Sequence, residues 1–411
     1  MKILSISAHF PPHHSGGYGI RVKNVMDGLA ERGHEILVLT TKVNRPVRAR
    51  EVNSNYPIER VLHNHFGIKR FLKELYFDAL DVGLIRQSIN DFKPDLIYLG
   101  HIYPISKQLM PLLASMPIRI MFDEGGNGLK GAWTDHGRWF RLLSDYKFKS
   151  KVINFLLPTL RRIILWVNNG KLVDNWAWPE KMHIIFNSEL NLKNAEHFGV
   201  PVHYARVIHS GVDSDKFRFK QRKNLSSPVK IIIPGRIEPK KGQIDGVRLL
   251  DHLTSIGVNC ELTFIGPYSN VDYTAQLKKE IGSLGLEEKV SFKDMVSQEN
   301  LVKLYHQADI CFFPSYHQSG FSRVPLEAMS CGCIVISYGN EGSAEIIKIG
   351  ITGYLVAPGE ISKVGEIIGL LAASSIMVRE VCAKAREEVV EKYSLPIYIQ
   401  KIEKILTYIV R

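Results

Sequence analysis

The chain of 411 residues is too long for a single compact core, so two domains of about 200 residues each are expected. Its 45% hydrophobic and 23% charged residues are ordinary for a globular protein and exclude a disordered or repetitive chain. The five cysteines form no C-x-x-C pair, which argues against a disulfide framework and favours a reducing compartment.

The formal net charge of +12 is concentrated in the first half of the chain. Residues 1–205 carry 27 Lys and Arg against 18 Asp and Glu, and residues 130–171 carry nine basic and two acidic residues. Such a surface attracts anionic lipid headgroups, an anionic acceptor or nucleic acid, or it is simply a solvated basic face. Nucleic acid is not expected as a partner, because no interleaved aromatic residues mark a known binding module.

Short apolar runs alternate with longer helical patterns along the chain, as in βα units with parallel sheets. In the first half, strands are expected over residues 2–7, 35–41, 95–100, 118–122, 183–187 and 205–209. In the second half, strands are expected over residues 229–234, 260–266, 290–293, 309–314, 334–337 and 353–356. We interpret the polar segment 216–228 as an interdomain linker, and apolar spacing predicts a last helix over 395–410.

The N-terminal strand is too short and too soon polar for a signal peptide. The most apolar long window, residues 152–167, is interrupted by Pro158, Arg161 and Arg162, which argues against a membrane-spanning helix. A helix that faces the core is the favoured interpretation of this window, and an amphipathic surface helix is the alternative.

The loop after the first predicted strand, HFPPHHSGGYG at residues 9–19, is a candidate ligand loop. Gly16 and Gly17 let the backbone approach a ligand closely, and a helix that begins near Tyr18 would point its N-terminus at that ligand. A dinucleotide-binding loop is a rival interpretation, although G-G-Y-G lacks the spacing of G-x-G-x-x-G. A purely structural turn is the third possibility.

The loop GRIEPKKG at residues 235–242 follows the first strand of the second half. Arg236 offers a planar fork for phosphate oxygens and Lys241 offers a mobile charge, so together they can hold a diphosphate. If the diphosphate is a leaving group, cations placed beforehand stabilise the transition state more than the ground state. Lys240 is expected to face solvent, and an isolated loop of this kind would be interpreted as a solvated basic turn.

The segment PSYHQSGFSRVPLEAMSC at residues 314–331 joins a predicted buried strand to a helix through a loop of small residues. Unpaired amides are expected there at Gly320, Phe321, Ser322 and Arg323, and with the helix dipole behind them they can hold phosphate. Ser322 is the expected N-cap. Glu327 lies one turn further in, where it could accept hydrogen bonds from a ribose diol, and a surface glutamate is the alternative.

These three stretches together resemble the glycosyltransferases of family 4. That family has a proline-containing loop with a Gly-Gly pair, a G-R pair followed by K-G, and two glutamates eight residues apart in the donor segment. Arg236, Lys241 and Glu327 match this pattern in order and spacing, whereas Ser319 stands where the first glutamate would contact the donor sugar. The serine brings no negative charge, so this difference bears on which sugar the donor carries more than on the fold.

The resemblance also implies a histidine near the reacting sugar, after the strand at 118–122. Asp123 occupies that position, followed by Glu124, and a carboxylate there could bind sugar hydroxyls, orient the acceptor or accept its proton. Capping of the next helix is an equal alternative for Asp123. His101, after the strand at 95–100, is a further acceptor-side candidate. No spacing predicts a metal site, and no cofactor is expected, because the cations would replace a metal.

The resemblance implies an α/β fold of GT-B type, in which two Rossmann-like domains face each other across a cleft. The expected domains are residues 1–215 on the acceptor side, joined by a last helix (395–411) that crosses back, and residues 216–394 on the donor side. The implied activity is retaining transfer of a sugar from a UDP- or GDP-linked donor to an acceptor hydroxyl.

The basic first half favours a lipid-linked or anionic glycan acceptor, and hence cell-surface polysaccharide or glycolipid assembly in the cytoplasm, at the inner face of the membrane. A nucleotide-sugar epimerase or hydrolase of the same fold is one alternative, and it would turn over donor without acceptor. A non-catalytic nucleotide-sugar-binding protein is the other, because Ser319 and Asp123 both depart from the family pattern.

Overall fold

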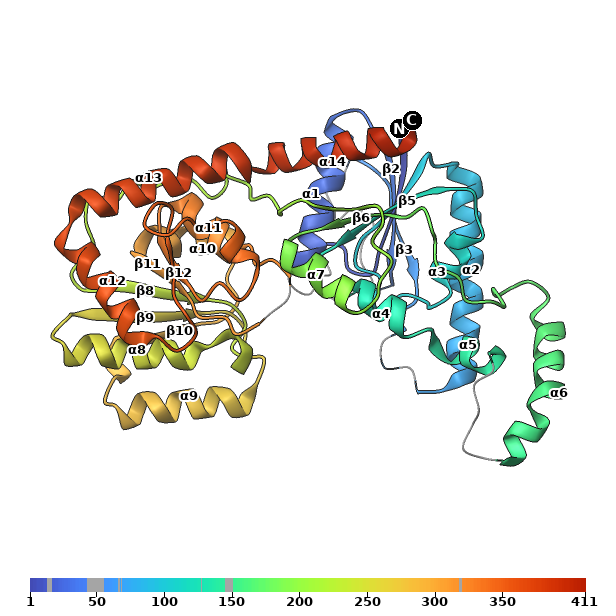
Figure 1. Ribbon diagram of the computed structural model, residues 1–411, viewed down its shortest axis with the longest axis horizontal. Helices are drawn as coiled ribbons and strands as arrows, with labels where there is room; N and C mark the ends of the chain where they lie inside the picture. Colours follow the sequence, from blue (N-terminus) through green and yellow to red (C-terminus); the bar gives the residue numbers. More distant parts are fainter. Residues whose placement is uncertain are drawn as a thin grey trace. The chain divides into compact units, whose positions relative to one another are not determined.

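The computed structural model describes residues 1–12, 17–42, 55–65, 67, 69–126, 128–144, 151–317 and 320–411, without the side chains of 151–153. These residues form two compact units, each built on one parallel sheet (Figure 1). Unit 1 comprises Met1–Asn187, Asn191–Ile208 and Ile399–Arg411. Unit 2 comprises Ser188–Leu190 and His209–Tyr398.

The sheet of unit 1 has the strand order β3-β2-β1-β4-β5-β6-β7, and all neighbouring strands are parallel. Its strands are β1 (Lys2–Ser7), β2 (Glu35–Thr41), β3 (Ile58–Leu62), β4 (Leu96–Leu99), β5 (Arg119–Glu124), β6 (His183–Phe186) and β7 (Ala205–Val207). Its helices are α1 (Gly17–Glu31), α2 (Phe71–Phe92), α3 (Leu109–Ala114), α4 (Gly128–Thr134), α5 (Gly137–Leu143), α6 (Lys151–Asn168) and α7 (Glu189–His197). The central strands β1 and β4 are almost wholly buried, as expected for a parallel sheet covered on both faces.

The sheet of unit 2 has the order β10-β9-β8-β11-β12-β13 and is also parallel. Its strands are β8 (Val229–Pro234), β9 (Cys260–Ile265), β10 (Val290–Lys293), β11 (Ile310–Phe313), β12 (Ile334–Ser337) and β13 (Tyr354–Leu355). Its α-helices are α8 (Gln243–Ser255), α9 (Val271–Ser283), α10 (Gln298–Gln307), α11 (Val324–Cys331), α12 (Ile361–Ala373) and α13 (Ser375–Lys392). Its short 3₁₀ turns are η1 (Pro239–Lys241), η2 (Glu287–Lys289) and η3 (Gly342–Glu345).

The last helix, α14 (Leu395–Val410), begins in unit 2 and continues into unit 1. Ile399 packs against Gly28 of α1, where an added Cβ would lie 2.2 Å from the Ile399 Cδ1. Glu403 pairs with Arg32 at 3.4 Å and with His34 at 2.9 Å. These contacts confirm the prediction that the last helix returns to the first domain.

The predicted strands all occur, each shifted by at most two residues at either end. Strand β3 was not predicted, because the IERVL sequence of this edge strand contains two charged residues and no continuous apolar run. The interpretation of residues 216–228 as a linker is wrong. This segment belongs to unit 2, where buried Arg222 donates hydrogen bonds to the carbonyl oxygens of Gly332 (2.6 Å) and Tyr305 (2.7 Å).

The favoured interpretation of residues 152–167 as a core-facing helix holds only for one stripe, on which Leu157 is buried and Ile164 packs against the core, and the alternative of an amphipathic surface helix fits the rest. The window forms α6, in which the side chains of Phe155 and Trp166 are 84% and 82% exposed. Among the described residues, no single helix is both long and apolar enough to cross a bilayer. Helices α12 and α13 meet these limits of length and composition only when they are taken together, and the chain bends by 107° between them.

Candidate active site

Three loops meet at the carboxyl ends of β8, β11 and β12 in unit 2. They are residues 235–242 after β8, the described residues 314–317 after β11, and residues 338–342 after β12. Because β8 and β12 flank β11, their carboxyl ends open on one edge of the sheet, where open α/β sheets bind their ligands.

Gly242 allows the first two loops to touch. Its φ is +67°, and an added Cβ would lie 2.0 Å from the carbonyl oxygen of Pro314. The Tyr316 amide donates a hydrogen bond to the Lys240 carbonyl oxygen at 2.9 Å, which fixes the same contact. Only glycine fits this position, so the basic loop is held against the end of β11.

Lys241 is anchored from the third loop. Its Nζ lies 2.7 Å from Glu341 Oε1, and the Ser315 hydroxyl donates to the same oxygen at 2.9 Å. The Glu341 side chain is only 3% exposed, so removal of Lys241 would leave a buried carboxylate without its cation. Lys241 is therefore positioned by residues that lie far from it in the sequence.

Arg236 is the most exposed cation of the loop. Its side chain is 59% exposed, and its guanidinium lies 3.4 Å from Glu238, whose carboxylate also pairs with Lys240 at 3.7 Å. The Lys240 side chain is 46% exposed, in keeping with the expectation that it faces solvent. Arg236 is thus free to turn toward an incoming anion at little cost to the fold.

The loop before α11 is partly described. Gly320 adopts φ +78°, and the Gly342 amide donates to its carbonyl oxygen at 3.2 Å, whereas Ser319 lies outside the described residues. Helix α11 begins at Val324 with Arg323 as its N-cap, so the prediction that Ser322 is the N-cap is wrong. The Ser322 hydroxyl instead accepts a hydrogen bond from the Val324 amide at 3.4 Å.

Phe321 is half-buried and lies against Gly342, where an added Cβ would come within 2.7 Å of its ring. The loop before α11 therefore also contacts the loop that carries Glu341. This contact brings the predicted donor residues Gly320 and Phe321 to the same edge of the sheet as Lys241.

Glu327 is buried in unit 2 and is not a surface residue. Its carboxylate pairs with Arg323 at 3.7 Å and accepts a hydrogen bond from the Tyr305 hydroxyl at 3.4 Å. Burial raises the pKa of Glu327, and Arg323 and Tyr305 partly oppose that rise. Both contacts are long, so the carboxylate keeps capacity to accept further hydrogen bonds.

The carboxyl edge of unit 1 gathers aromatic and imidazole side chains from the loops after β1 and β4 and from α1. His101 stacks on His9 with ring centroids 4.9 Å apart and meets Tyr18 edge-on at 5.3 Å. Burial, and then the charge of His9, lower the pKa of His101 to about 4, so its imidazole is neutral at pH 7. Gly17 begins α1 beside this group, and Gly16 lies outside the described residues.

Asp123 and Glu124 are both buried at the end of β5. The Asp123 carboxylate lies 3.0 Å from the Arg21 guanidinium and accepts a hydrogen bond from the Tyr98 hydroxyl at 2.6 Å. Glu124, rather than Asp123, caps the next helix by accepting hydrogen bonds from the amides of Gly126 and Leu129. Burial raises the pKa of both carboxyl groups, and their hydrogen bonds and Arg21 partly oppose the rise.

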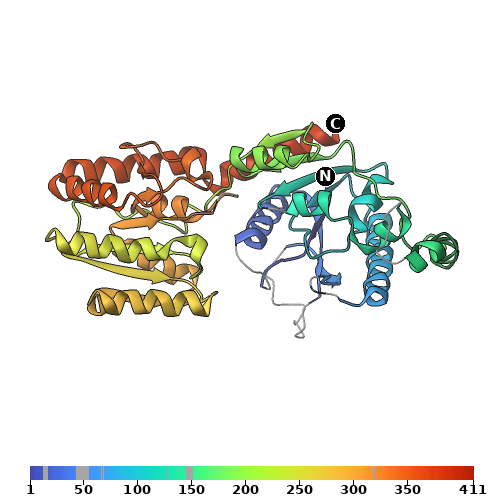
Figure 2. The same ribbon diagram turned by 60° about the horizontal axis from the view of Figure 1, so that its bottom comes forward.

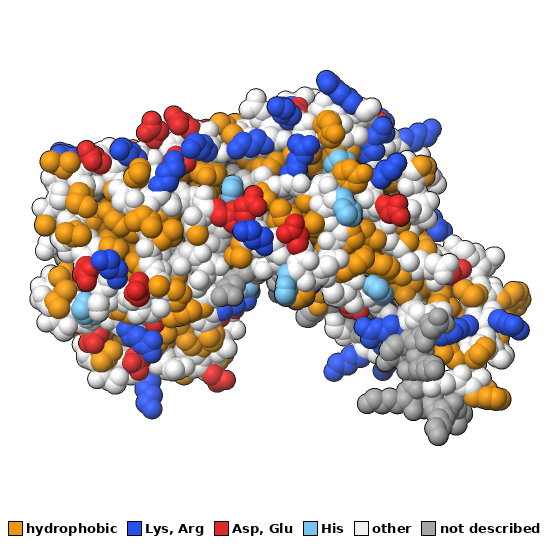
Figure 3. Space-filling view, in the orientation of Figure 1, with side chains coloured by type: hydrophobic (Ala, Val, Ile, Leu, Met, Phe, Trp, Pro, Cys, Tyr) orange, Lys and Arg blue, Asp and Glu red, His pale blue; other side chains and the backbone are white. Residues whose placement is uncertain are grey.

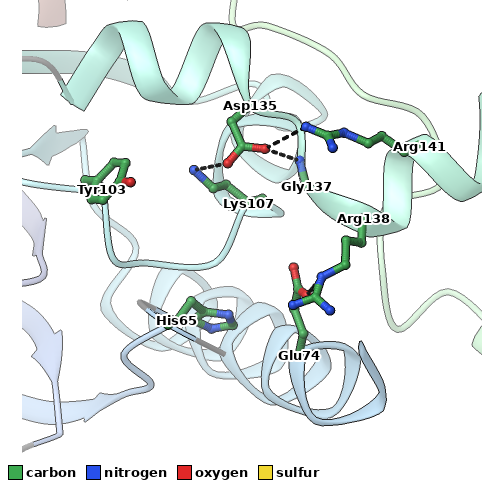
Figure 4. Close-up of a pocket in the computed structure, with 9 residues that line it drawn as sticks. His65, Glu74, Tyr103, Lys107, Asp135, Gly137, Arg138 and Arg141 are labelled. Atoms are coloured by element: carbon green, nitrogen blue, oxygen red, sulfur yellow. Dashed lines mark hydrogen bonds and ion pairs between the residues drawn. The ribbon is translucent and has the colours of Figure 1, made fainter. Parts of the chain in front are cut away.

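A cavity of about 590 Å³ opens elsewhere in unit 1, and no predicted site residue lines it (Figure 4). Lys107 and Arg141 point at Asp135 from 3.5 and 3.4 Å, and Arg138 pairs with Glu74 at 2.7 Å. Three cations for two carboxylates give the wall a net positive charge. The lining residues are His65, Gly67, Glu74, Tyr103, Lys107, Asp135, Gly137, Arg138 and Arg141.

Several of the residues that position these groups carry no sequence signal. Glu341 pairs with Lys241 across 100 residues, and Arg21 pairs with Asp123 across 102. Asp245 is likewise buried on α8 and accepts hydrogen bonds from Tyr316 and, at 2.8 Å, Tyr338. Such pairings depend on the tertiary fold, so spacing along the chain could not have revealed them. Among the residues that the structure describes, no cluster of three His, Cys, Asp or Glu side chains could hold a metal ion.

Comparison with known proteins places both halves of the chain in one enzyme family. The model described as Glycosyltransferase Family 4 matches residues 15–216, and the model described as Glycosyl transferases group 1 matches residues 213–388. An uncharacterized glycosyltransferase of Methanocaldococcus jannaschii is 24% identical over 406 residues, which cover 96% of this chain and 95% of the relative. The amylovoran biosynthesis glycosyltransferase AmsK of Erwinia amylovora is 28% identical over 213 residues, about half of each chain.

Among solved structures, Anabaena HepE in complex with UDP and glucose has the same fold. The TM-score is 0.68 at 19% identity, with 99% of this chain and 100% of that chain covered. The two parallel sheets, with the motifs in order along them, agree with this assignment. The chain is therefore a glycosyltransferase of family 4, with the GT-B fold.

Proposed function

We propose that the enzyme transfers a sugar from a UDP- or GDP-linked donor to an acceptor hydroxyl with retention of the anomeric configuration. The contact of the three loops in unit 2 carries this proposal, because it gathers Arg236, Lys241 and the Gly320 loop on one sheet edge. The fold neighbour HepE, which was crystallised with UDP and with UDP-glucose, supports a nucleotide-sugar donor.

In this proposal, the basic loop acts on the leaving group. Negative charge grows on the diphosphate as the bond to the anomeric carbon breaks, so Arg236 and Lys241 stabilise the transition state more than the bound donor. The amides of Gly320, Phe321 and Ser322 would hold the phosphates at the N-terminus of α11. Glu327 would accept hydrogen bonds from the ribose diol, and Ser319 would contact the donor sugar without adding charge.

Retention follows if the acceptor attacks from the face that the diphosphate leaves. A phosphate oxygen of the leaving group would then take the proton of the acceptor hydroxyl, and no separate base is needed. The cations of the loop would do the work that a divalent metal does in other transferases. Activity should therefore be unchanged in excess EDTA, and full loss that Mg²⁺ restores would refute this part.

We assign the acceptor to unit 1. His101, Asp123 and Glu124 lie at the carboxyl edge of its sheet, and Arg21 and Tyr98 hold the Asp123 carboxylate in place. Asp123 would orient the acceptor, either by direct contact or after a small shift of its side chain. The positively charged cavity next to α5 suits an anionic glycan or phosphate group. A lipid-linked or anionic acceptor, used in surface polysaccharide or glycolipid assembly at the cytoplasmic face of the membrane, fits these features best.

A panel of radiolabelled UDP- and GDP-sugars, each incubated with a membrane lipid extract, tests the proposed function. We expect one donor to transfer label to the organic phase. NMR of the product should show that the new linkage has the same anomeric configuration as the donor. Donor turnover without any labelled product would instead indicate a hydrolase or epimerase. Donor binding without turnover would indicate a non-catalytic binding protein.

A further inference from the structure

Helix α6 packs on unit 1 through one narrow stripe. Leu157 and Asn168 are buried on that stripe, and Arg161 lies between them. The Arg161 guanidinium donates to the carbonyl oxygens of Leu142, at 2.7 Å from Nε, and Ser144. These contacts hold α6 beside α5, and Figures 1 and 2 both show it on the outer side of unit 1.

Among the described residues, the opposite face of α6 is largely apolar and exposed to solvent. Its residues follow each other at helical spacing and are all exposed: Phe155, Leu156, Leu160, Ile163, Trp166 and Val167. Single exposed apolar residues are ordinary, but a contiguous set that includes two almost fully exposed aromatic rings marks an interaction surface. We call this set the α6 apolar face.

Exposed cations lie beside the α6 apolar face. Arg162 on the helix and Lys171 just after it are exposed, and the stretch of sequence that contains the helix, residues 130–171, carries nine Lys and Arg against two Asp and Glu. Figure 3 shows basic and hydrophobic side chains together at the edge of unit 1 where Figure 1 places α6. The partner of this surface should therefore be both apolar and anionic.

We propose that α6 is an interfacial helix that docks unit 1 on an anionic lipid bilayer. A helix with Trp, Phe and Leu on its free face and cations beside it lies in the plane of the headgroups, with the apolar side chains in the acyl boundary. Anionic headgroups attract the flanking cations. A second copy of the chain is a poorer partner, because the cationic surroundings would then face each other.

This inference rests on the proposed function in one respect only, namely that the acceptor is held in a membrane. Docking through α6 would keep unit 1 at the surface that holds a lipid-linked acceptor. The docking surface itself is separate from the loops of unit 2. Membrane binding and nucleotide binding can therefore fail independently of each other.

Flotation of the full chain with vesicles tests the docking surface. Wild-type protein should float with phosphatidylcholine vesicles that contain phosphatidylglycerol, and bind pure phosphatidylcholine roughly tenfold more weakly. The variant Phe155→Gln/Ile163→Gln/Trp166→Gln should bind anionic vesicles at least about tenfold more weakly. Because all three side chains are exposed, its thermal unfolding should match that of the wild type.

The matched control is Leu370→Gln/Ile376→Gln in unit 2, which removes two similarly exposed apolar side chains (60% and 59%) and should leave vesicle binding unchanged. Trp166 supplies a second readout, a blue shift of tryptophan emission on vesicle addition that the Trp166→Phe variant lacks. The inference would be overturned if the triple variant bound anionic vesicles as tightly as the wild type, or if the wild type did not bind them. It would also be overturned if the wild type were a dimer and the triple variant a monomer. Retained nucleotide binding in those cases would leave the proposed function standing.

Discussion

At the residue scale, Arg236 and Lys240 form a matched pair. Both are exposed cations of one loop, and both lie near the same carboxylate of Glu238. Lys241 is a less clean probe, because its removal also leaves buried Glu341 unpaired. The proposal gives a catalytic role to Arg236 and none to Lys240.

Arg236→Ala should lower kcat for sugar transfer by roughly 10²–10³-fold, the usual effect of removing one preplaced group that stabilises developing charge. Lys240→Ala should stay within about twofold of the wild type, since an exposed and weakly paired lysine contributes little. Both rates are measured with the donor that the panel selects. Equal losses in the two variants would mean that only the total charge of the loop matters.

His101 makes stability depend on pH. Its pKa falls from 6.5 in the unfolded chain to about 4 in the folded protein, so between these values only the unfolded chain takes up the proton. The stabilisation is complete above pH 6.5 and is lost as pH falls toward 4, by on the order of 3 kcal/mol.

The variant His101→Gln cannot take up this proton. Its free energy of unfolding in urea should therefore fall less between pH 7 and pH 4.5 than that of the wild type. Parallel pH profiles of the two proteins would show that burial of His101 does not set the pH dependence.

At the element scale, the close approach of Gly242 to β11 sets the position of the basic loop. Gly242→Ala introduces both a left-handed alanine and a Cβ 2.0 Å from the Pro314 oxygen. Gly285→Ala is the control, because Gly285 has a similar φ of +64° and no atom within 4 Å of the added Cβ.

The control should lose about 1 kcal/mol in urea unfolding, and Gly242→Ala should lose a further 1–3 kcal/mol, roughly the cost of overpacking. Only Gly242→Ala should also weaken nucleotide binding, since the clash displaces Arg236 and Lys241. If Gly242→Ala binds nucleotide as the wild type does, the loop contact does not position the site.

The sequence predicted most strands because buried parallel strands are continuous apolar runs. The sequence did not predict segments that are buried by contacts with residues remote along the chain. Arg222 is polar, yet its guanidinium is buried against backbone carbonyl groups, so a segment with the composition of a linker is part of unit 2. In α6 the apolar spacing was correctly identified as helical, but spacing alone does not say whether an apolar face meets the core or another partner.

At the scale of the whole molecule, the order of the motifs along the chain was predictable, whereas the residues that hold the motif side chains in position were not. The residues 235–242 and 314–331 follow strands that the sequence revealed, so their meeting at one sheet edge follows from parallel topology. Glu341, Arg21 and Tyr98 were not predicted, since each acts on a residue that is remote in sequence. The assignments of Gly16 and Ser319 to the donor site stay predictions outside the described residues.

In the proposed mechanism, the loop cations bind the diphosphate leaving group more strongly than they bind the same phosphates in the intact donor. Titration calorimetry in EDTA, with the nucleoside diphosphate and its sugar conjugate as separate ligands, measures this difference directly. Arg236→Ala should weaken binding of the nucleoside diphosphate at least about tenfold and affect the nucleotide sugar less, while Lys240→Ala changes neither. Equal weakening of both ligands, or no binding by the wild type, would contradict the claim.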